Sequence, residues 1–248
     1  MRSLFRIGEA TEAPAERAPE PVTRKRRRDA GQTQITVRDL MVLPWVGEQY
    51  AVRLDQLQLL LARVADPTAE LEEGTGLDAA RHVLGRWEKL GLAASRKVYA
   101  DQPRWLWLTS KGLSRLERRY RFKTPAENRF AHYHAVNQVR LYLEGARYAP
   151  EARWRPERDL IPEGARLGET HYVDGEVETQ GRTVGIEVER TPKRPDDLLV
   201  ILRGLTAAYE SVWYFALSEA KPGVERQIAR LPEPSRKRIT VFRLEPLL

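Results

Sequence analysis

Two short segments in the C-terminal half of the chain alternate between apolar and polar residues, and a turn signal separates them. The segments are residues 173–178 and 183–189, and Gln180-Gly181 lies between them. Alternation of this kind is typical of β-strands, because successive side chains point to opposite faces of a sheet. A two-residue connection that contains glycine is typical of a tight hairpin. The sequence therefore predicts a two-stranded hairpin with one apolar and one acidic face.

The register of this hairpin decides what its acidic face can do. A two-residue turn places Asp174 directly opposite Glu187. Like charges opposed across two strands destabilise a sheet, so the cluster is expected either to be fully solvated or to hold a divalent cation. The predicted apolar face carries Val173, Val177, Val184, Ile186 and Val188, and the acidic face carries Asp174, Glu176, Glu178, Thr183, Gly185, Glu187 and Glu189.

Composition limits the partners that the chain can have. With 42% hydrophobic residues among 248 and a formal net charge of +7, it is expected to fold and to bind a polyanion, with nucleic acid ahead of an anionic membrane surface. No window has the apolar length of a transmembrane helix, and the first residues lack a signal-peptide core. The absence of cysteine fits a reducing compartment. We therefore expect a cytoplasmic protein with no membrane partner.

Three regions differ in character along the chain. Residues 1–33 are predicted to be a disordered basic tail, because their Ala, Pro and Glu content and the basic run 24–28 cannot form a core. That run either contacts phosphates or is simply solvated. Residues 34–122 have a mainly helical pattern, and residues 123–248 alternate helices with strands. The helices of the middle region are expected to start after Thr36, after Asp55 and at Leu77, and to end near Pro44, before Asp66 and at Leu90.

A hairpin pattern follows these three helices. Residues 92–99 and 104–108 are expected to be strands joined by a turn at 100–103, and Thr109 opens a short helix. This layout resembles a winged helix-turn-helix, which implies binding to double-stranded DNA; the alternative is a helical packing domain. The resemblance rests on Leu84, Trp87, Leu90-Gly91-Leu92 and Trp107-Leu108-Thr109-Ser110-Lys111-Gly112.

Cations on the third helix and around the wing are the candidate DNA contacts. Those on the helix are expected to face a major groove, where base edges supply specificity, while phosphate contacts supply most of the affinity. The sequence does not say which of them contacts a base. The helix contributes Arg81, His82, Arg86 and Lys89, and Arg96, Lys97 and Arg104 flank the wing.

The last region is predicted to run helix, strand, strand, strand, helix, strand, helix, strand. Helices interleaved with strands favour a mixed sheet covered on both faces, which makes the whole chain α+β or α/β. The expected helices cover residues 128–145, 196–209 and 223–231, and the strands that surround the hairpin cover 153–161, 212–217 and 238–244.

This order and the acidic hairpin resemble the restriction-endonuclease-like fold with its PD-(D/E)xK signature. Asp174 matches the first acidic position and Glu187 the second, whereas Glu189 stands where lysine is expected. The resemblance implies that Asp174 and Glu187 are ligands of Mg²⁺ and that the domain cleaves phosphodiesters. Lys193 is the candidate for a displaced cation, with simple solvation as the alternative. Glu157 is a candidate further ligand, or else the partner of a neighbouring arginine.

The helix before the sheet carries three more polar candidates. His134 and Asn137 share a helical face, and His132 precedes them. They are expected either to make a polar contact toward the acidic site or to be ordinary hydrogen-bonded residues. No phosphate-binding glycine loop, HExxH pair or GxSxG elbow is present, so nucleotide hydrolysis and serine-hydrolase chemistry have no support.

Together the two predicted domains resemble the replication-relaxation family of bacterial plasmids and other mobile elements. The motif is Asp174-Gly175, Gly181, Gly185-Ile186-Glu187-Val188-Glu189, Thr191 and Lys193. The resemblance implies DNA binding in replication, mobilisation or transcriptional control. Three hypotheses follow from it: a Mg²⁺-dependent DNA endonuclease, a non-cleaving regulator that acts as a homodimer, and an adaptor that docks to a replication or mobilisation protein.

Overall fold

The computed structural model describes residues 33–71, 76–145, 151–161 and 171–248. Thr33–Leu248 forms one compact unit of mixed α and β structure. The predicted tail and its basic run lie outside the described residues, apart from Thr33. Among the described residues, no helix combines the length and apolar character that crossing a bilayer requires.

The first part of this unit consists of helices and a small antiparallel sheet. The sheet has the strand order β1-β3-β2, with Val52 opposite Leu106 and Ala93 opposite Leu108. The predicted hairpin between residues 92 and 108 is confirmed. The elements are α1 (Val37–Glu48), β1 (Val52–Arg53), α2 (Leu54–Ala65), α3 (Asp78–Lys89), β2 (Ala93–Arg96), β3 (Trp105–Leu108) and α4 (Ser110–Leu113).

Helix α1 begins where the sequence predicts and ends later. Thr36 and Asp39 form a reciprocal capping box that satisfies the first backbone N–H groups. The expected stop near Pro44 is wrong, because the helix continues through it to Glu48. Proline removes one helical hydrogen bond, but Trp45 and Val46 are buried in the core and hold the last turn in place.

Helix α3 and the strands after it follow the predicted pattern closely. Val83, Leu84 and Trp87 are buried at helical spacing. Gly91 ends the helix with a φ of 69°, a left-handed conformation that favours glycine. Thr109 caps α4 by accepting a hydrogen bond from the backbone N–H of Gly112.

The second part is built on a five-stranded sheet of order β4-β5-β6-β7-β8. The first three strands are antiparallel, and β6, β7 and β8 run parallel. The predicted mixed sheet is therefore confirmed. Its elements are η1 (Glu127–Arg129), α5 (Phe130–Leu143), β4 (Arg153–Pro156), α6 (Glu157–Leu160), β5 (Gly175–Thr179), β6 (Arg182–Glu189), α7 (Pro195–Ala208), β7 (Ser211–Ala216), α8 (Lys221–Ala229), α9 (Glu233–Arg236), β8 (Ile239–Arg243) and η2 (Glu245–Leu247).

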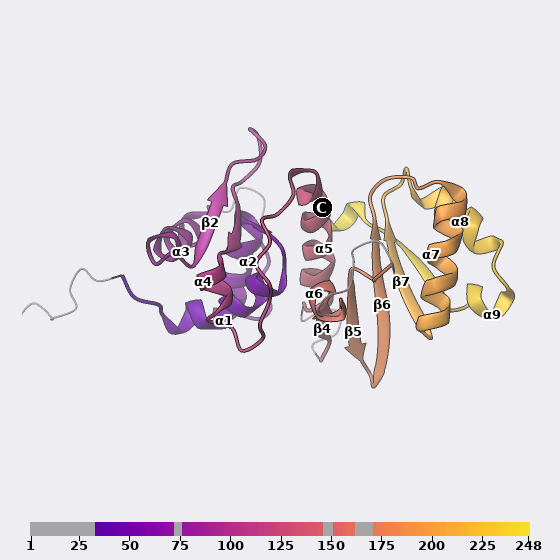
Figure 1. Cartoon of the computed structure of the whole chain (residues 1–248), viewed down its shortest axis with the longest axis horizontal. Coiled ribbons are helices and arrows are strands. Elements are labelled where there is room, and N and C mark those ends of the chain that lie inside the picture. Colours follow the sequence, from indigo (N-terminus) through magenta and orange to yellow (C-terminus); the bar gives the residue numbers. More distant parts are fainter. Residues whose placement is uncertain (1–32, 72–75, 146–150, 162–170) are drawn as a thin grey trace, which may run out of the picture. The chain divides into compact units, whose positions relative to one another are not determined.

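Helices cover both faces of this sheet (Figure 1). Helix α5 packs Val136 and Val139 against Val184, Ile186 and Val188. On the other face α7 and α8 cover β7, whose residues Val212 and Tyr214 are fully buried. The cores of both faces are apolar, which explains why the sheet is stable between its helices.

Two expectations about this sheet are wrong. The strand predicted for residues 153–161 ends at Pro156, and a helical turn follows, with Glu157 and Asp159 at its N-terminus where negative charge is favourable. Val173 does not share the apolar face of Val177. It packs with Leu198 and its neighbours, because β5 begins only at Gly175 and strict alternation does not extend before that residue.

Buried hydrogen bonds join the two parts of the unit. Nδ2 of Asn137 donates to the backbone carbonyl of Ala51 (2.9 Å) and to Oε1 of Gln56 (3.1 Å). Nε2 of Gln56 in turn donates to the carbonyl of His134 (3.1 Å). The backbone of His134 and the side chain of Asn137 thus contact the first part of the chain, so of the two predicted alternatives the polar contact toward the acidic site is wrong for these two residues.

Candidate functional site

The predicted hairpin register is confirmed. Gln180 and Gly181 form the turn with φ values of 49° and 72°, and the pairing of Gly175 with Ile186 brings Asp174 opposite Glu187. Glu187 and Glu189 are buried, with 2% and 4% of their surface exposed. These two acids are therefore not a solvated face, although Glu178 on the same hairpin is exposed.

Asp174 is held by a histidine and by the backbone. Nε2 of His132 on α5 donates to its Oδ1 (2.8 Å), and the backbone N–H of Val188 donates to its Oδ2 (2.8 Å). Burial alone would raise the pKa of Asp174, but His132 and the Val188 N–H lower it below its ordinary range. Burial likewise disfavours the charged form of His132, yet Asp174 raises the pKa of that imidazole. The pair is therefore a buried, charge-assisted contact.

Glu187 has its own histidine. Nε2 of His171 donates to Oε2 of Glu187 (3.0 Å), and Nζ of Lys193 lies 3.8 Å from Oε1. Burial and the neighbouring Asp174 charge raise the pKa of Glu187 despite these two cations. Burial lowers and Glu187 raises the pKa of His171, and the net direction is upward. Burial and the charge of Asp174 therefore favour the protonated form of Glu187.

Lys193 also contacts Glu189, the residue that stands where the PD-(D/E)xK signature has lysine. Its ammonium forms an ion pair with Oε2 of Glu189, and the hydroxyl of Tyr214 donates to the same oxygen (3.2 Å). Burial and the nearby acids raise the pKa of Tyr214, which keeps its hydroxyl protonated as a donor. The alternative that Lys193 is simply solvated is wrong, because it bridges Glu189 and Glu187.

Glu157 lies beside this cluster at the start of α6. It lines a small pocket together with Tyr50, His132, Arg158 and Asp174. Burial and the charge of Asp174 raise the pKa of Glu157 to about 7. No ion pair of Glu157 with an arginine occurs among the described residues, so the expected pairing with a neighbouring arginine is wrong in this part of the chain.

The candidate DNA contacts on α3 differ in how firmly other side chains hold them. Arg81 pairs with Asp78 at the surface, and Lys89 is exposed without a described partner. Arg86 differs, since its guanidinium binds both carboxylate oxygens of Asp39 (2.9 and 2.5 Å), and Asp39 is fully buried. Arg86 therefore supports the fold in this structure and is not available for a base. His82 is exposed and donates from Nδ1 to the backbone carbonyl of Asp78.

The cations at the wing are exposed and weakly held. Arg96 pairs with Glu127, Nζ of Lys97 donates to the carbonyl of Gln102 (2.5 Å), and Nη1 of Arg104 donates to the hydroxyl of Ser95 (3.1 Å). Exposed contacts of this kind contribute little to stability, so they can be exchanged for phosphate contacts.

Two histidines complete this cluster, and only His132 is a candidate from the sequence. For His132 the predicted alternative of a polar contact toward the acidic site is confirmed, whereas His134 and Asn137 make no such contact. His171 lies two residues before the first predicted strand of the hairpin, and the sequence pattern assigns it no role. Its position three residues before Asp174 is the signal that could have drawn attention to it.

Mg²⁺ suits the oxygen ligands of this cluster. The described residues contain no group of three His, Cys, Asp or Glu side chains arranged for a metal ion. Mg²⁺ is commonly bound through one or two carboxylates, with water and substrate phosphates completing its shell. Asp174 and Glu187 supply two carboxylates of this kind, and both oxygens of Asp174 already accept hydrogen bonds. Neither a scan against protein-family models nor a search of curated proteins found a match to the chain.

Proposed function

We propose that this protein binds duplex DNA of a plasmid or mobile element and cleaves a phosphodiester bond with Mg²⁺. The observation that carries the proposal is the trio of Asp174, Glu187 and Lys193: the largely buried Asp174 and the buried Glu187 are opposed in the hairpin register, and the ammonium of Lys193 lies 3.8 Å from Glu187. These are the charges of the PD-(D/E)xK signature, with the lysine reached from a position four residues beyond Glu189.

The element order supports each half of the proposal. The succession α1-β1-α2-α3-β2-β3 fits a winged helix-turn-helix, with α3 as the helix that enters the major groove. Apart from the short helices α6 and α9, the succession α5, β4, β5, β6, α7, β7, α8, β8 fits the restriction-endonuclease-like order expected from the sequence. The overall charge of +7 favours a polyanionic partner.

The residues of the chain have distinct roles in this chemistry. Asp174 and Glu187 would hold the metal, which when bound polarises the scissile phosphate and lowers the pKa of the attacking water. Lys193 supplies positive charge next to the carboxylates and faces the developing negative charge. His132 and His171 orient the two carboxylates and neutralise part of their repulsion before DNA arrives.

A non-cleaving regulator of transcription or replication is the second candidate. Two observations favour it: Glu189 stands in the lysine position, and both carboxylates already have histidine partners. Such a regulator binds an operator or origin with an affinity that falls with salt. It has no use for the carboxylate of Glu187.

A plasmid-nicking assay separates the two candidates. Supercoiled plasmid is incubated with the protein and Mg²⁺ or Mn²⁺, alongside D174A, E187Q and the exposed hairpin control E178Q. The nuclease predicts nicking by the parent and by E178Q, and loss of about 100-fold or more in D174A and E187Q. Absence of nicking, or nicking that survives D174A, contradicts the nuclease. A discrete footprint on DNA that is unchanged in E187Q then supports the regulator.

A further inference from the structure

A row of cations lies in the segment between α4 and η1. Residues 114–126 contain neither helix nor strand, and Arg119, Arg121 and Lys123 occupy every second position. All three side chains are exposed, whereas Tyr120 between them is partly buried. We call these three residues the linker row.

The backbone of this segment is fastened to α6. Nη2 of Arg158 donates to the carbonyl of Arg121 (2.9 Å), and the hydroxyl of Tyr120 donates to Oδ1 of Asp159 (2.8 Å). Arg118 forms an ion pair with the same Asp159. The residues next to the linker row are thus fixed, which holds the row in place before a partner arrives and lowers the entropic cost of binding.

The side chains of the linker row form no ion pair in the part of the chain that the structure describes. Within the described residues, no hydrogen bond or ion pair involves the side chains of Arg119, Arg121 or Lys123. Lys221 and Lys237 differ, because each of them pairs with a glutamate one turn away. Three like charges within five residues repel each other, and a polyanion relieves that repulsion.

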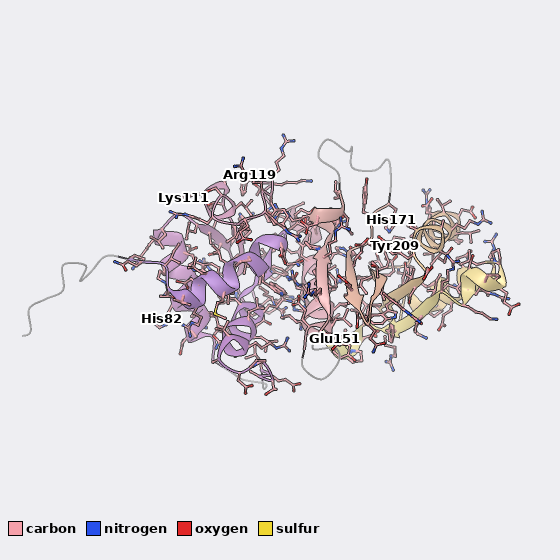
Figure 2. All side chains as sticks on the ribbon, turned by 90° about the horizontal axis from the view of Figure 1, so that it is seen from below. His82, Lys111, Arg119, Glu151, His171 and Tyr209 are labelled. Carbon is pink, nitrogen blue, oxygen red and sulfur yellow. The ribbon has the colours of Figure 1, made fainter. Side chains whose placement is uncertain are left out.

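The row also lies close to the acidic cluster. Arg158, which holds the carbonyl of Arg121, follows Glu157 and lines the same small pocket as Asp174. At the other end the segment follows α4, where Lys111 is exposed. Figure 2 shows Lys111 and Arg119 projecting on the same side of the view. The linker row therefore lies between the winged-helix elements and the candidate cleavage site.

We propose that the linker row binds the phosphate backbone of duplex DNA and forms a second DNA contact, separate from α3 and the wing. This inference rests on the proposed DNA-binding function and assigns a further surface to it. Because the row carries charge and no fixed base-reading geometry, its contacts are independent of sequence. It would hold the duplex against the part of the fold that carries Asp174 and Glu187.

Salt-dependent binding of a labelled 30-base-pair duplex tests the proposal. The full chain is compared with R119Q/R121Q/K123Q and with the control R203Q/R226Q/R236Q, which removes three exposed arginines from α7, α8 and α9. Fluorescence anisotropy is measured in EDTA over a series of KCl concentrations, and thermal unfolding verifies that each variant is folded. Loss of three phosphate contacts lowers the slope of log K against log salt by about 2.7. It weakens binding on the order of tenfold near physiological salt, and the control retains the slope of the parent.

The outcomes distinguish this inference from the function on which it rests. If the parent binds no duplex even at low salt, both fail. Suppose that the parent binds the duplex and that K89Q on α3 weakens this binding, but that the linker variant behaves like the control. The proposed DNA contact of the linker row is then wrong, and the proposed function stands. Vesicles with 30% phosphatidylserine form the last arm. Loss of vesicle binding in the linker variant with unchanged DNA binding overturns the proposal in favour of a lipid surface.

Discussion

Nε2 of His132 lies 2.8 Å from Oδ1 of Asp174, and this contact joins α5 to the acidic hairpin. Both side chains are largely buried, with 23% and 11% of their surface exposed. The pKa of His132 is raised and that of Asp174 is lowered, so the charged pair is the stable form near neutral pH. Because of this contact, the free energy of unfolding should depend on pH, and that dependence can be measured.

Replacing His132 by glutamine is expected to lower stability within a defined pH window. A raised histidine pKa contributes stability below its ordinary value of 6.5, and that contribution is lost as pH rises through the folded pKa. A lowered Asp174 pKa contributes stability above its ordinary 3.8, and that contribution is lost as pH falls through the folded pKa. The difference in free energy of unfolding between parent and H132Q should peak between these values, at about 1–3 kcal/mol.

Urea denaturation at several pH values measures this difference. The control is H82Q on α3, because His82 is exposed. A destabilisation by H132Q that stays constant from pH 4 to pH 9 would show that the contact carries no charge.

Arg86 is expected to stabilise the folded protein and not to contact a DNA base. Its guanidinium holds the fully buried carboxylate of Asp39, whose pKa is lowered by that contact and by the Thr36 cap against the effect of burial. R86Q leaves a buried charge without its partner and should cost about 3–5 kcal/mol. R81Q, which removes an exposed pair with Asp78, should change stability by at most about 1 kcal/mol. Equal unfolding midpoints for R86Q and R81Q would refute this role.

Two glycines are expected to respond to alanine in opposite ways. A Cβ on Gly112 would lie 2.0 Å from the backbone oxygen of Leu92, so G112A forces α4 away from the strand segment and should cost about 1–3 kcal/mol or more. Gly204 in α7 has nothing within 4 Å of the added atom. G204A should stabilise the protein by about 0.5–1 kcal/mol, because alanine favours the helix. Thermal unfolding of both variants measures the two signs.

The ionised carboxylate of Glu157 is expected to lower the free energy of unfolding at alkaline pH. Its pKa rises from 4.5 to about 7, so the folded protein binds this proton more tightly than the unfolded chain does. That contribution is complete below pH 4.5 and declines as pH rises to about 7. E157Q removes this dependence and should raise stability relative to the parent by roughly 1–3 kcal/mol at pH 8, and by less at pH 5. The exposed E178Q provides the control. An equal effect of E157Q at both pH values would argue against the raised pKa.

Local sequence pattern was enough to predict most elements and the hairpin register. The alternation of Val184, Ile186 and Val188 and the turn at Gln180-Gly181 specify neighbouring strands, so the opposition of Asp174 and Glu187 follows from short-range rules. The capped start of α1 at Thr36 is equally local. The continuation of α1 through Pro44 is not, since it depends on burial of Trp45 against distant residues.

The partners of the candidate site depended on the tertiary structure. The sequence determined the register that sets Asp174 opposite Glu187, and alternation along one strand determined that Glu187 and Glu189 share a face. Only folding decided that His132, from a helix 42 residues earlier, reaches Asp174 and that Lys193 bridges Glu187 and Glu189. The reason is physical: strand alternation and turns are set by neighbouring residues, whereas the partner of a buried charge is set by which elements pack over it.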